Sequence, residues 1–200
     1  MTDSQNLNGY PLILGSSSPQ RLRLLGLADI YPDTVFNPQV DESCLARENP
    51  RDYCERIAHR KADVTLEAHP DTSVLCADTI VTVGRRILQK PKDSTTAFHH
   101  LRLLSGRRHQ VMTCVVLANR ATSLSCSRTV VTRVKFQRLS EADIRRYVEN
   151  KTEWEGRAGG YGIQGRAAAF IYWINGSHTN VEGLPLVETV NLLRGTGCRP

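Results

Sequence analysis

The stretch "SVLCADTIVTV", residues 73–83, decides the fold class of this chain. It is rich in Val, Ile and Thr, which favour extended backbone, so it predicts a long buried strand. Gly84 then predicts a turn toward a second short strand in "RILQKP". Asp78 lies inside the apolar run, where a carboxylate without a partner is costly to desolvate. We therefore interpret Asp78 as a metal ligand or general base rather than as a purely structural residue.

Helical and extended patterns alternate on both sides of this strand. Further strands are predicted at residues 12–15, 35–40, 110–117, 128–136 and 168–174. Helices are predicted at residues 19–28, 50–68, 95–104, 140–150 and 185–194. Ser18, Asn49, Asp93 and Ser140 precede four of these helices and are typical N-cap residues. The alternation predicts an α/β fold with a mixed sheet.

Length and composition indicate an ordinary globular protein. With 200 residues, 40% of them hydrophobic and 23% charged, the chain is expected to form a single domain, residues 1–200, with residues 1–10 as a loose tail. The N-terminal "MTDSQNLNGY" lacks the basic and then apolar pattern of a signal peptide. No apolar run approaches the roughly 18 residues of a membrane span. We therefore expect a cytoplasmic protein without a membrane partner.

Charge and cysteine usage narrow the choice of ligands. The net charge is +6, but Lys and Arg are spread along the chain and form no dense run interleaved with aromatic residues. A small anionic substrate therefore fits at least as well as a nucleic acid, which we do not expect as a partner. The six cysteines are scattered without a C-x-x-C pair, which argues against structural zinc and predicts free, buried thiols.

The stretch "LGSSSPQRLRLL", residues 14–25, is a candidate anion site. It places serine hydroxyls, the free N–H groups of a helix N-terminus and the guanidinium of Arg21 at one strand-to-helix corner. The alternative is an ordinary N-cap followed by a surface arginine, and the corner by itself leaves both interpretations open. It is not a Walker loop, because G-x-x-x-x-G-K-[ST] is absent.

Other polar residues are ambiguous when taken singly. Glu42, in "DES", is a further carboxylate or part of a solvated turn, and Lys61 and Lys90 taken alone predict surface residues. The segment "GRAGGYGIQG", residues 156–165, contains Gln164 among glycines that let backbone approach a ligand closely. It predicts a site for a planar, hydrogen-bonding base, with a flexible connection as the alternative.

Taken together, these segments resemble the Maf family of nucleoside triphosphate pyrophosphatases. The matching segments follow the family's order from Leu12 to Leu193, and they are "LGSSSPQRLRLL", "DES", "RKA", "ADTIV", "QKP", "LSGRRHQVMT" and "GRAGGYGIQGRAAAFI…INGS…NVEGLPL". The resemblance implies a fold akin to inosine triphosphate pyrophosphatase, with an elongated mixed central sheet flanked by helices and two lobes around a cleft. It also implies a house-cleaning enzyme, which hydrolyses a nucleoside triphosphate to the monophosphate and pyrophosphate.

The resemblance also assigns roles by position. "GGYGIQG" is similar to the branch that acts on dTTP and UTP. The family pattern makes Asp78 the catalytic acid and places Gln20, Thr79 and Gln164 where substrate choice is set. Its phosphate and metal positions are Ser16, Arg21, Glu42, Lys61 and Lys90. A divalent cation, Mg²⁺ or Mn²⁺, is expected on Asp78 and Glu42, and the resemblance leaves a homodimer open.

One residue departs from the family pattern. The family's corner usually contains Ser-Pro-Arg-Arg, and Gln20 stands here in place of the first arginine. The departure removes a positive charge at a specificity position. It therefore leaves open modified pyrimidine nucleotides as substrates beside dTTP and UTP, and the alternative is a pyrophosphatase for 7-methyl-GTP or another non-standard nucleotide. Because the family is linked with arrest of cell division, the resemblance also leaves open a catalytically weak nucleotide-binding protein that affects cell division.

Overall fold

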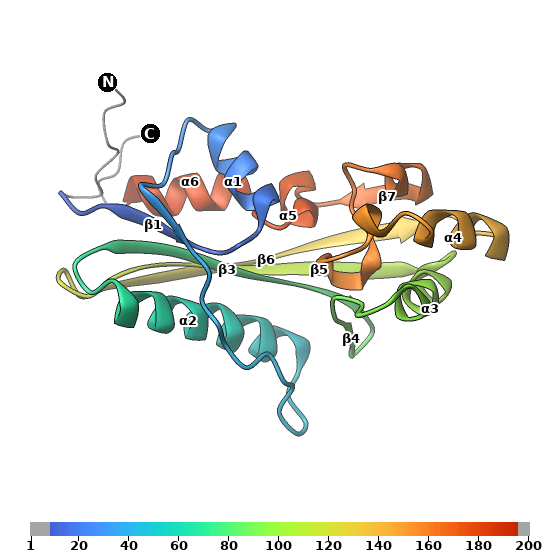
Figure 1. Ribbon diagram of the computed structural model, residues 1–200, viewed down its shortest axis with the longest axis horizontal. Helices are drawn as coiled ribbons and strands as arrows, with labels where there is room; N and C mark the ends of the chain where they lie inside the picture. Colours follow the sequence, from blue (N-terminus) through green and yellow to red (C-terminus); the bar gives the residue numbers. More distant parts are fainter. Residues whose placement is uncertain (1–8, 196–200) are drawn as a thin grey trace. The chain divides into compact units, whose positions relative to one another are not determined.

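A computed structural model describes residues 9–195 of the chain (Figure 1). Most of the expected N-terminal tail (residues 1–8) and Cys198 lie outside the described residues. Strands form one sheet in the order β2-β1-β3-β5-β6-β7, and β4 pairs with β3. Their bounds are β1 (Leu12–Gly15), β2 (Thr34–Phe36), β3 (Ser73–Val83), β4 (Arg86–Leu88), β5 (Arg108–Asn119), β6 (Leu124–Phe136) and β7 (Ile171–Asn175).

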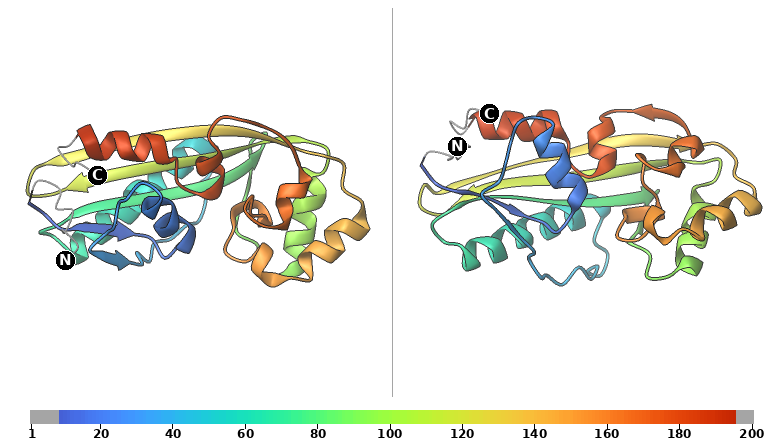
Figure 2. Two further views of the ribbon diagram at one scale, coloured as in Figure 1. Left: turned by 90° about the horizontal axis from the view of Figure 1, so that it is seen from above. Right: turned by 45° about the horizontal axis from the view of Figure 1, so that its top comes forward.

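The sheet is mixed, which confirms the predicted fold class. Strand β1 runs parallel to both β2 and β3, with Gly15 opposite Cys76. The β3–β4 and β6–β7 pairs are antiparallel. The long strands β5 and β6, predicted as neighbours along the chain, lie side by side in both views of Figure 2.

The helices begin at the capping residues that the sequence indicates. Their bounds are α1 (Pro19–Gly26), α2 (Pro50–Ala68), α3 (Ser94–Leu104), α4 (Glu141–Val148), α5 (His178–Glu182) and α6 (Leu186–Gly195). The side chains of Asn49 and Asp93 accept hydrogen bonds from backbone N–H groups in the first turns of α2 and α3. Ser140 and Asp143 form a capping box at the start of α4.

Contacts divide the chain into two compact units. Unit 1 takes the chain up to Asp78, Thr113–Val130 and the chain from Gly183 onward, and unit 2 takes Thr79–Met112 and Val131–Glu182. Strands β3, β5 and β6 each contribute residues to both units. The expected single domain and the expected cleft between two lobes stay predictions.

Unit 1 has helices on both faces of its strands. Helix α2 covers one face, and α1 and α6 lie on the opposite face (Figure 1). Gly15 has no side chain at a point where β1 passes close to β3 and α2. A Cβ there would lie 2.3 Å from Cys76 Sγ and 2.7 Å from Thr65 Oγ1, so only glycine allows this close packing.

Unit 2 has a core of its own. Helix α3 packs against α4 and against a short 3₁₀ turn, Ala158–Gly160 (Figure 2). The rings of His109, Phe136 and Tyr161 make mutual edge-to-face contacts in this core. The His109 ring is 3% exposed, and its Nε2 lies 2.8 Å from the Tyr161 hydroxyl oxygen. The histidine is therefore a structural residue of this core.

The burial of His109 predicts an acid-dependent loss of stability. Desolvation lowers the pKa of the imidazole from 6.5 to about 4, because the buried ring cannot hydrate a positive charge. Below pH 6.5 the unfolded chain therefore binds a proton at His109, whereas the folded protein does not bind this proton until the pH falls to about 4. We expect this residue to lower the free energy of unfolding by up to about 1.4 kcal/mol per pH unit as pH falls through that window.

Urea unfolding at several pH values between about 4 and 6.5 measures the slope of the free energy of unfolding against pH. His109→Gln should flatten the slope, whereas His99→Gln, at an exposed position on α3, should leave it unchanged. Equal slopes in the wild type and His109→Gln would show that this histidine is not the titrating group.

Three parts of the predicted secondary structure are wrong in detail. Residues 166–170 form a 3₁₀ helix, so the last strand begins at Ile171 rather than at residue 168. The strand predicted at 35–40 is shorter, Thr34–Phe36, and Pro38 lies two residues beyond its end. Helix α5 lies in a segment for which the sequence predicted no helix or strand.

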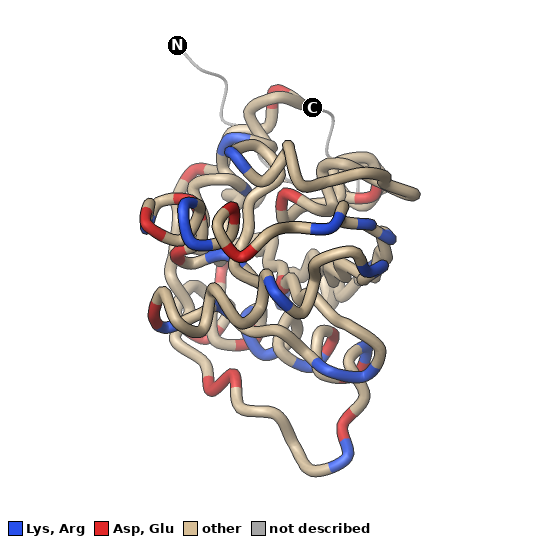
Figure 3. Tube along the Cα trace, turned by 90° about the vertical axis from the view of Figure 1, so that its right-hand side faces the viewer, with Lys and Arg blue, Asp and Glu red and all other residues tan. Residues whose placement is uncertain are grey.

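The distribution of charge agrees with the sequence. Basic and acidic residues are interspersed along the trace in Figure 3. Among residues 9–195, no helix is long and apolar enough to cross a membrane. The cytoplasmic location and the homodimer stay predictions.

Candidate functional site

Asp78 and Lys61 form a buried ion pair in unit 1, and the partly exposed carboxylate of Glu42 joins it. Asp78 lies in β3 with 7% of its surface exposed, and its Oδ1 is 2.6 Å from Lys61 Nζ. Glu42 Oε1 lies 2.7 Å from the same nitrogen. Lys61 lies on the inner face of α2, one turn from Ile57 and from Thr65, which are both fully buried. The surface position that Lys61 suggests when taken alone is therefore wrong, and the lysine joins two carboxylates from distant parts of the sequence.

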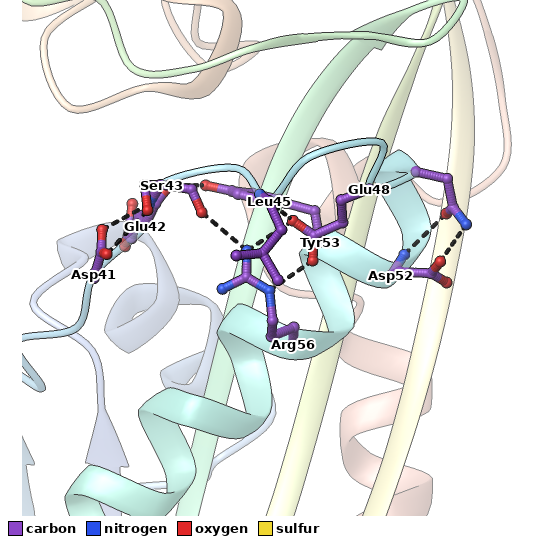
Figure 4. A network of polar contacts seen from close by, with 9 residues as sticks. Asp41, Glu42, Ser43, Leu45, Glu48, Asp52, Tyr53 and Arg56 are labelled. Atoms are coloured by element: carbon purple, nitrogen blue, oxygen red, sulfur yellow. Dashed lines mark hydrogen bonds and ion pairs between the residues drawn. The ribbon is translucent and has the colours of Figure 1, made fainter.

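Hydrogen bonds anchor the loop that carries Glu42 to the start of α2 (Figure 4). The Tyr53 hydroxyl donates to the Glu42 carbonyl oxygen at 2.8 Å, and Arg56 donates to the Ser43 carbonyl oxygen at 3.0 Å. Arg56 also contacts both carboxylate oxygens of Glu48, which lowers the pKa of Glu48 to about 2. These contacts fix the backbone beside Glu42, while its side chain remains 41% exposed.

Buried cysteines lie around the strand that carries Asp78. The Cys54 thiol donates to the Asp78 carbonyl oxygen at 3.4 Å, and Cys76 Sγ lies 3.6 Å from Thr65 Oγ1. Burial raises the pKa of Cys76 and Cys114 to about 11, so both thiols stay neutral at pH 7. The expected free, buried thiols are confirmed for these three cysteines, whereas Cys44 is exposed and Cys126 half-buried.

Arg21 and Ser16 form the strand-to-helix corner of unit 1. Arg21 is only 8% exposed, and it donates from Nη1 to Ser16 Oγ at 2.9 Å and from Nε to the Gly183 carbonyl oxygen at 2.8 Å. Burial lowers the pKa of Arg21, and the negative charge of Asp78 opposes that shift. The alternative of a surface arginine is therefore wrong.

The serines of this corner are also engaged in local contacts. The Ser18 hydroxyl donates to Gln20 Oε1 at 3.1 Å instead of capping α1, and the Ser18 backbone N–H donates to Ser16 Oγ at 3.2 Å. The corner thus holds a buried cation and hydroxyl groups at a helix N-terminus, which suits an anion.

The remaining predicted site residues belong to unit 2. Thr79 directly follows Asp78 in β3 and is half-buried, and Lys90 is exposed beyond the end of β4. Gln164 is exposed in the glycine-rich segment, where its Nε2 donates to Glu182 Oε2 at 2.8 Å. Sequence reasoning missed Glu182, because the glutamate is 18 positions away in a segment without a predicted helix.

The carboxylates of Asp78 and Glu42 fit a particular kind of divalent cation site. Within residues 9–195, no group of three His, Cys, Asp or Glu side chains could hold a metal ion. Mg²⁺ commonly takes only one or two carboxylates from a protein and completes its shell with phosphate oxygens and water. Because Asp78 and Glu42 already converge on one ammonium group, they fit a cation bound together with a phosphate-bearing substrate.

Known proteins with similar sequences bear the names of pyrophosphatases. Two bacterial relatives, from Roseobacter denitrificans and Rhodospirillum rubrum, bear the name dTTP/UTP pyrophosphatase and are each 49% identical to this chain. The first alignment covers 94% of this chain and 97% of the relative, and the second covers 95% and 90%. The solved structure of the Staphylococcus aureus Ham1 protein matches with a TM-score of 0.43 and 13% identity over 62% of this chain and 71% of that one, which is too low to support an argument.

A family model settles the classification. The model described as "Maf-like protein" matches residues 11–196, which include every predicted site residue. The chain belongs to the Maf family.

Proposed function

We propose that this protein is a pyrophosphatase that hydrolyses dTTP and UTP to the nucleoside monophosphate and pyrophosphate. The observation that carries the proposal is the buried Asp78 carboxylate, held at 2.6 Å by Lys61 beside a second carboxylate. A buried acid with a specific charged partner is typical of a catalytic site. The relatives named dTTP/UTP pyrophosphatase, at 49% identity, support the substrate.

The phosphates are bound by cationic and hydroxyl groups in this proposal. Arg21 and Ser16 bind phosphate oxygens at the N-terminus of α1, and Lys90 contributes a further positive charge. Lys61 stabilises the negative charge that develops on the departing pyrophosphate. Mg²⁺ or Mn²⁺ held by Asp78 and Glu42 would neutralise phosphate charge and acidify water.

Asp78 acts on the attacking water. Its carboxylate orients the water toward the α-phosphorus and accepts a proton as the new P–O bond forms. The bond between the α-phosphorus and its bridging oxygen breaks, and that oxygen leaves with pyrophosphate. Lys61 keeps the carboxylate in place, because its ammonium group contacts Asp78 Oδ1 directly.

The base is recognised by Gln164 and Thr79 in this proposal. An amide offers one donor and one acceptor to the edge of a pyrimidine, and a threonine hydroxyl offers either. Thymine and uracil differ only in the 5-methyl group, which forms no hydrogen bond with either side chain. Recognition by Gln164 and Thr79 therefore suits both bases, which is consistent with relatives named for both dTTP and UTP.

A screen of all common nucleoside triphosphates, with Mg²⁺ and with Mn²⁺, tests the proposal. Monophosphate and pyrophosphate are both quantified, and we expect dTTP and UTP to give the highest kcat/KM with one pyrophosphate per monophosphate. Release of orthophosphate in place of pyrophosphate, or a clear preference for 7-methyl-GTP, would contradict the proposal.

Gln20→Arg is expected to raise kcat/KM for dTTP or UTP several-fold to about tenfold. The reason is that a charged hydrogen bond contributes about 1.5–3 kcal/mol and a neutral one about 0.5–1.5 kcal/mol. Leu22→Arg is the matched control, because Leu22 lies on the same helix and is 43% exposed. It adds the same charge and should change kcat/KM little. A fall in activity of Gln20→Arg at unchanged stability would mean that Gln20 binds a neutral group of a different substrate.

A further inference from the structure

The amide of Gln164 is held on both sides by charged residues of unit 2. Its Nε2 donates to Glu182 Oε2 at 2.8 Å, and its Oε1 accepts from Arg157 Nη1 at 3.3 Å. The two partners leave the amide one orientation, because an ionised carboxylate only accepts hydrogen bonds and a guanidinium only donates them. If the amide turned by 180°, two acceptors would meet at Glu182 and two donors would meet at Arg157.

Glu182 is itself held firmly. Its side chain is only 6% exposed, and its other oxygen, Oε1, lies 3.0 Å from His178 Nδ1 one turn earlier in α5. A carboxylate engaged at both oxygens has little freedom to rotate away from Gln164. It therefore acts as a fixed acceptor next to an exposed amide.

Arg157 reaches Gln164 only because residue 162 is glycine. A Cβ at Gly162 would lie 1.6 Å from Arg157 Nη1, so any side chain there would displace the end of the arginine. Arg157 Nη2 also donates to the Thr152 carbonyl oxygen at 3.4 Å. The absence of a side chain at Gly162 thus permits the contact between Arg157 and Gln164.

The fixed amide still has hydrogen-bonding capacity for a ligand. Of its two N–H donors one is taken by Glu182, and of the two lone pairs on its oxygen one is taken by Arg157. One donor and one acceptor remain, in a fixed order. This is the complement of the N3–H donor and O4 acceptor of uracil and thymine.

We propose that Glu182 is a positioning residue which, with Arg157, fixes the Gln164 amide so that the site accepts uracil and thymine and rejects cytosine. Cytosine presents the reverse pattern, an N3 acceptor beside an N4 amino donor, and an amide free to rotate could pair with either base. Discrimination therefore comes from locking the amide and not from the glutamine alone. The inference rests on the proposed function, in which Gln164 contacts the base.

The test compares UTP and CTP, two substrates of nearly equal size, in the wild type and in Glu182→Gln. A neutral amide at position 182 can donate or accept, so only Arg157 then favours one orientation of the Gln164 amide. We expect the ratio of kcat/KM for UTP to that for CTP to fall about tenfold. The change should appear mainly in KM, because the base contact is made equally before and during the reaction.

Glu141→Gln is the matched control, because Glu141 also pairs with a basic residue one turn away, Arg145 of α4, but both side chains of that pair are more than half exposed. The control should keep the wild-type ratio. Gly162→Ala is the second variant, because it displaces Arg157 while leaving the Glu182 carboxylate in place, and it should lower the ratio in the same direction. If Glu182→Gln does not fold, the ratio of kcat/KM for UTP and CTP in Gly162→Ala tests the proposal.

The outcomes separate this inference from the proposed function. A wild-type protein that leaves UTP intact would overturn the proposed function, and the inference with it. A wild-type preference for UTP that persists in both variants would overturn the inference alone. So would a loss of activity in equal proportion for UTP and CTP, because that result indicates a general structural role for Glu182.

Discussion

Asp78→Asn is expected to lower kcat by about 10²–10⁴-fold, the usual loss when a general base is removed. The amide keeps the shape of the side chain and an oxygen that can accept the bond from Lys61 Nζ, now 2.6 Å long. It cannot accept a proton from the attacking water. Because Lys61 retains Glu42 as a counter-ion at 2.7 Å, we expect the variant to fold.

Steady-state kinetics with dTTP and UTP, together with circular dichroism, measure this effect. Asp63→Asn changes an exposed aspartate of α2 and should leave kcat unchanged, which controls for loss of negative charge on the unit. A near-normal kcat in folded Asp78→Asn would show that this carboxylate is structural. The proposed role of Asp78 would then have to be abandoned.

The largest expected effect on stability comes from Lys61→Met. Removing one partner of a buried ion pair leaves an uncompensated charge, and such changes cost about 3–5 kcal/mol. Methionine fills a similar volume on the inner face of α2, so the cost arises chiefly from Asp78, which is only 7% exposed. The same variant should lose most of its activity, because nothing then orients the Asp78 carboxylate.

Denaturant unfolding gives the change in free energy directly. Lys151→Met is the control: Lys151 pairs with Glu155 at 2.7 Å, but both side chains are more than half exposed. Such surface pairs contribute only about 0.3–0.5 kcal/mol. If Lys61→Met were as stable as Lys151→Met, the contacts of Lys61 with Asp78 and Glu42 would not stabilise the protein.

Local chemistry explains why most of the fold could be predicted. The β-branched run at residues 73–83 forms β3 with the predicted bounds, and Asn49 caps α2 as expected. The failures occurred where local signals were weak. The alanines of residues 166–170 favour helix, and the strand they precede is short and partly exposed. Helix α5 has only five residues, too few for a periodic pattern to develop.

The candidate site shows a different limit. Asp78 stands out in the sequence because a charge interrupts an apolar strand. Lys61 does not stand out, because its burial depends on which face of α2 meets β3, and a single lysine in an amphipathic helix carries no such signal. Glu182 could not be found either, because its partner Gln164 is brought near by tertiary folding. Resemblance to a family assigned Lys61 a role, but it did not reveal Glu182.

The bare backbone at Gly15 makes the choice of residue there depend on two other positions of the chain. The space that a side chain would need is already occupied by the Cys76 sulfur and the Thr65 hydroxyl, on two other elements. A methyl group at position 15 therefore requires those two side chains to shift or to be replaced by smaller ones. Because Cys76 lies two residues before Asp78, a smaller residue at position 76 would loosen the packing of the strand that carries the carboxylate. A substitution at Gly15 is thus coupled to the residues at positions 65 and 76.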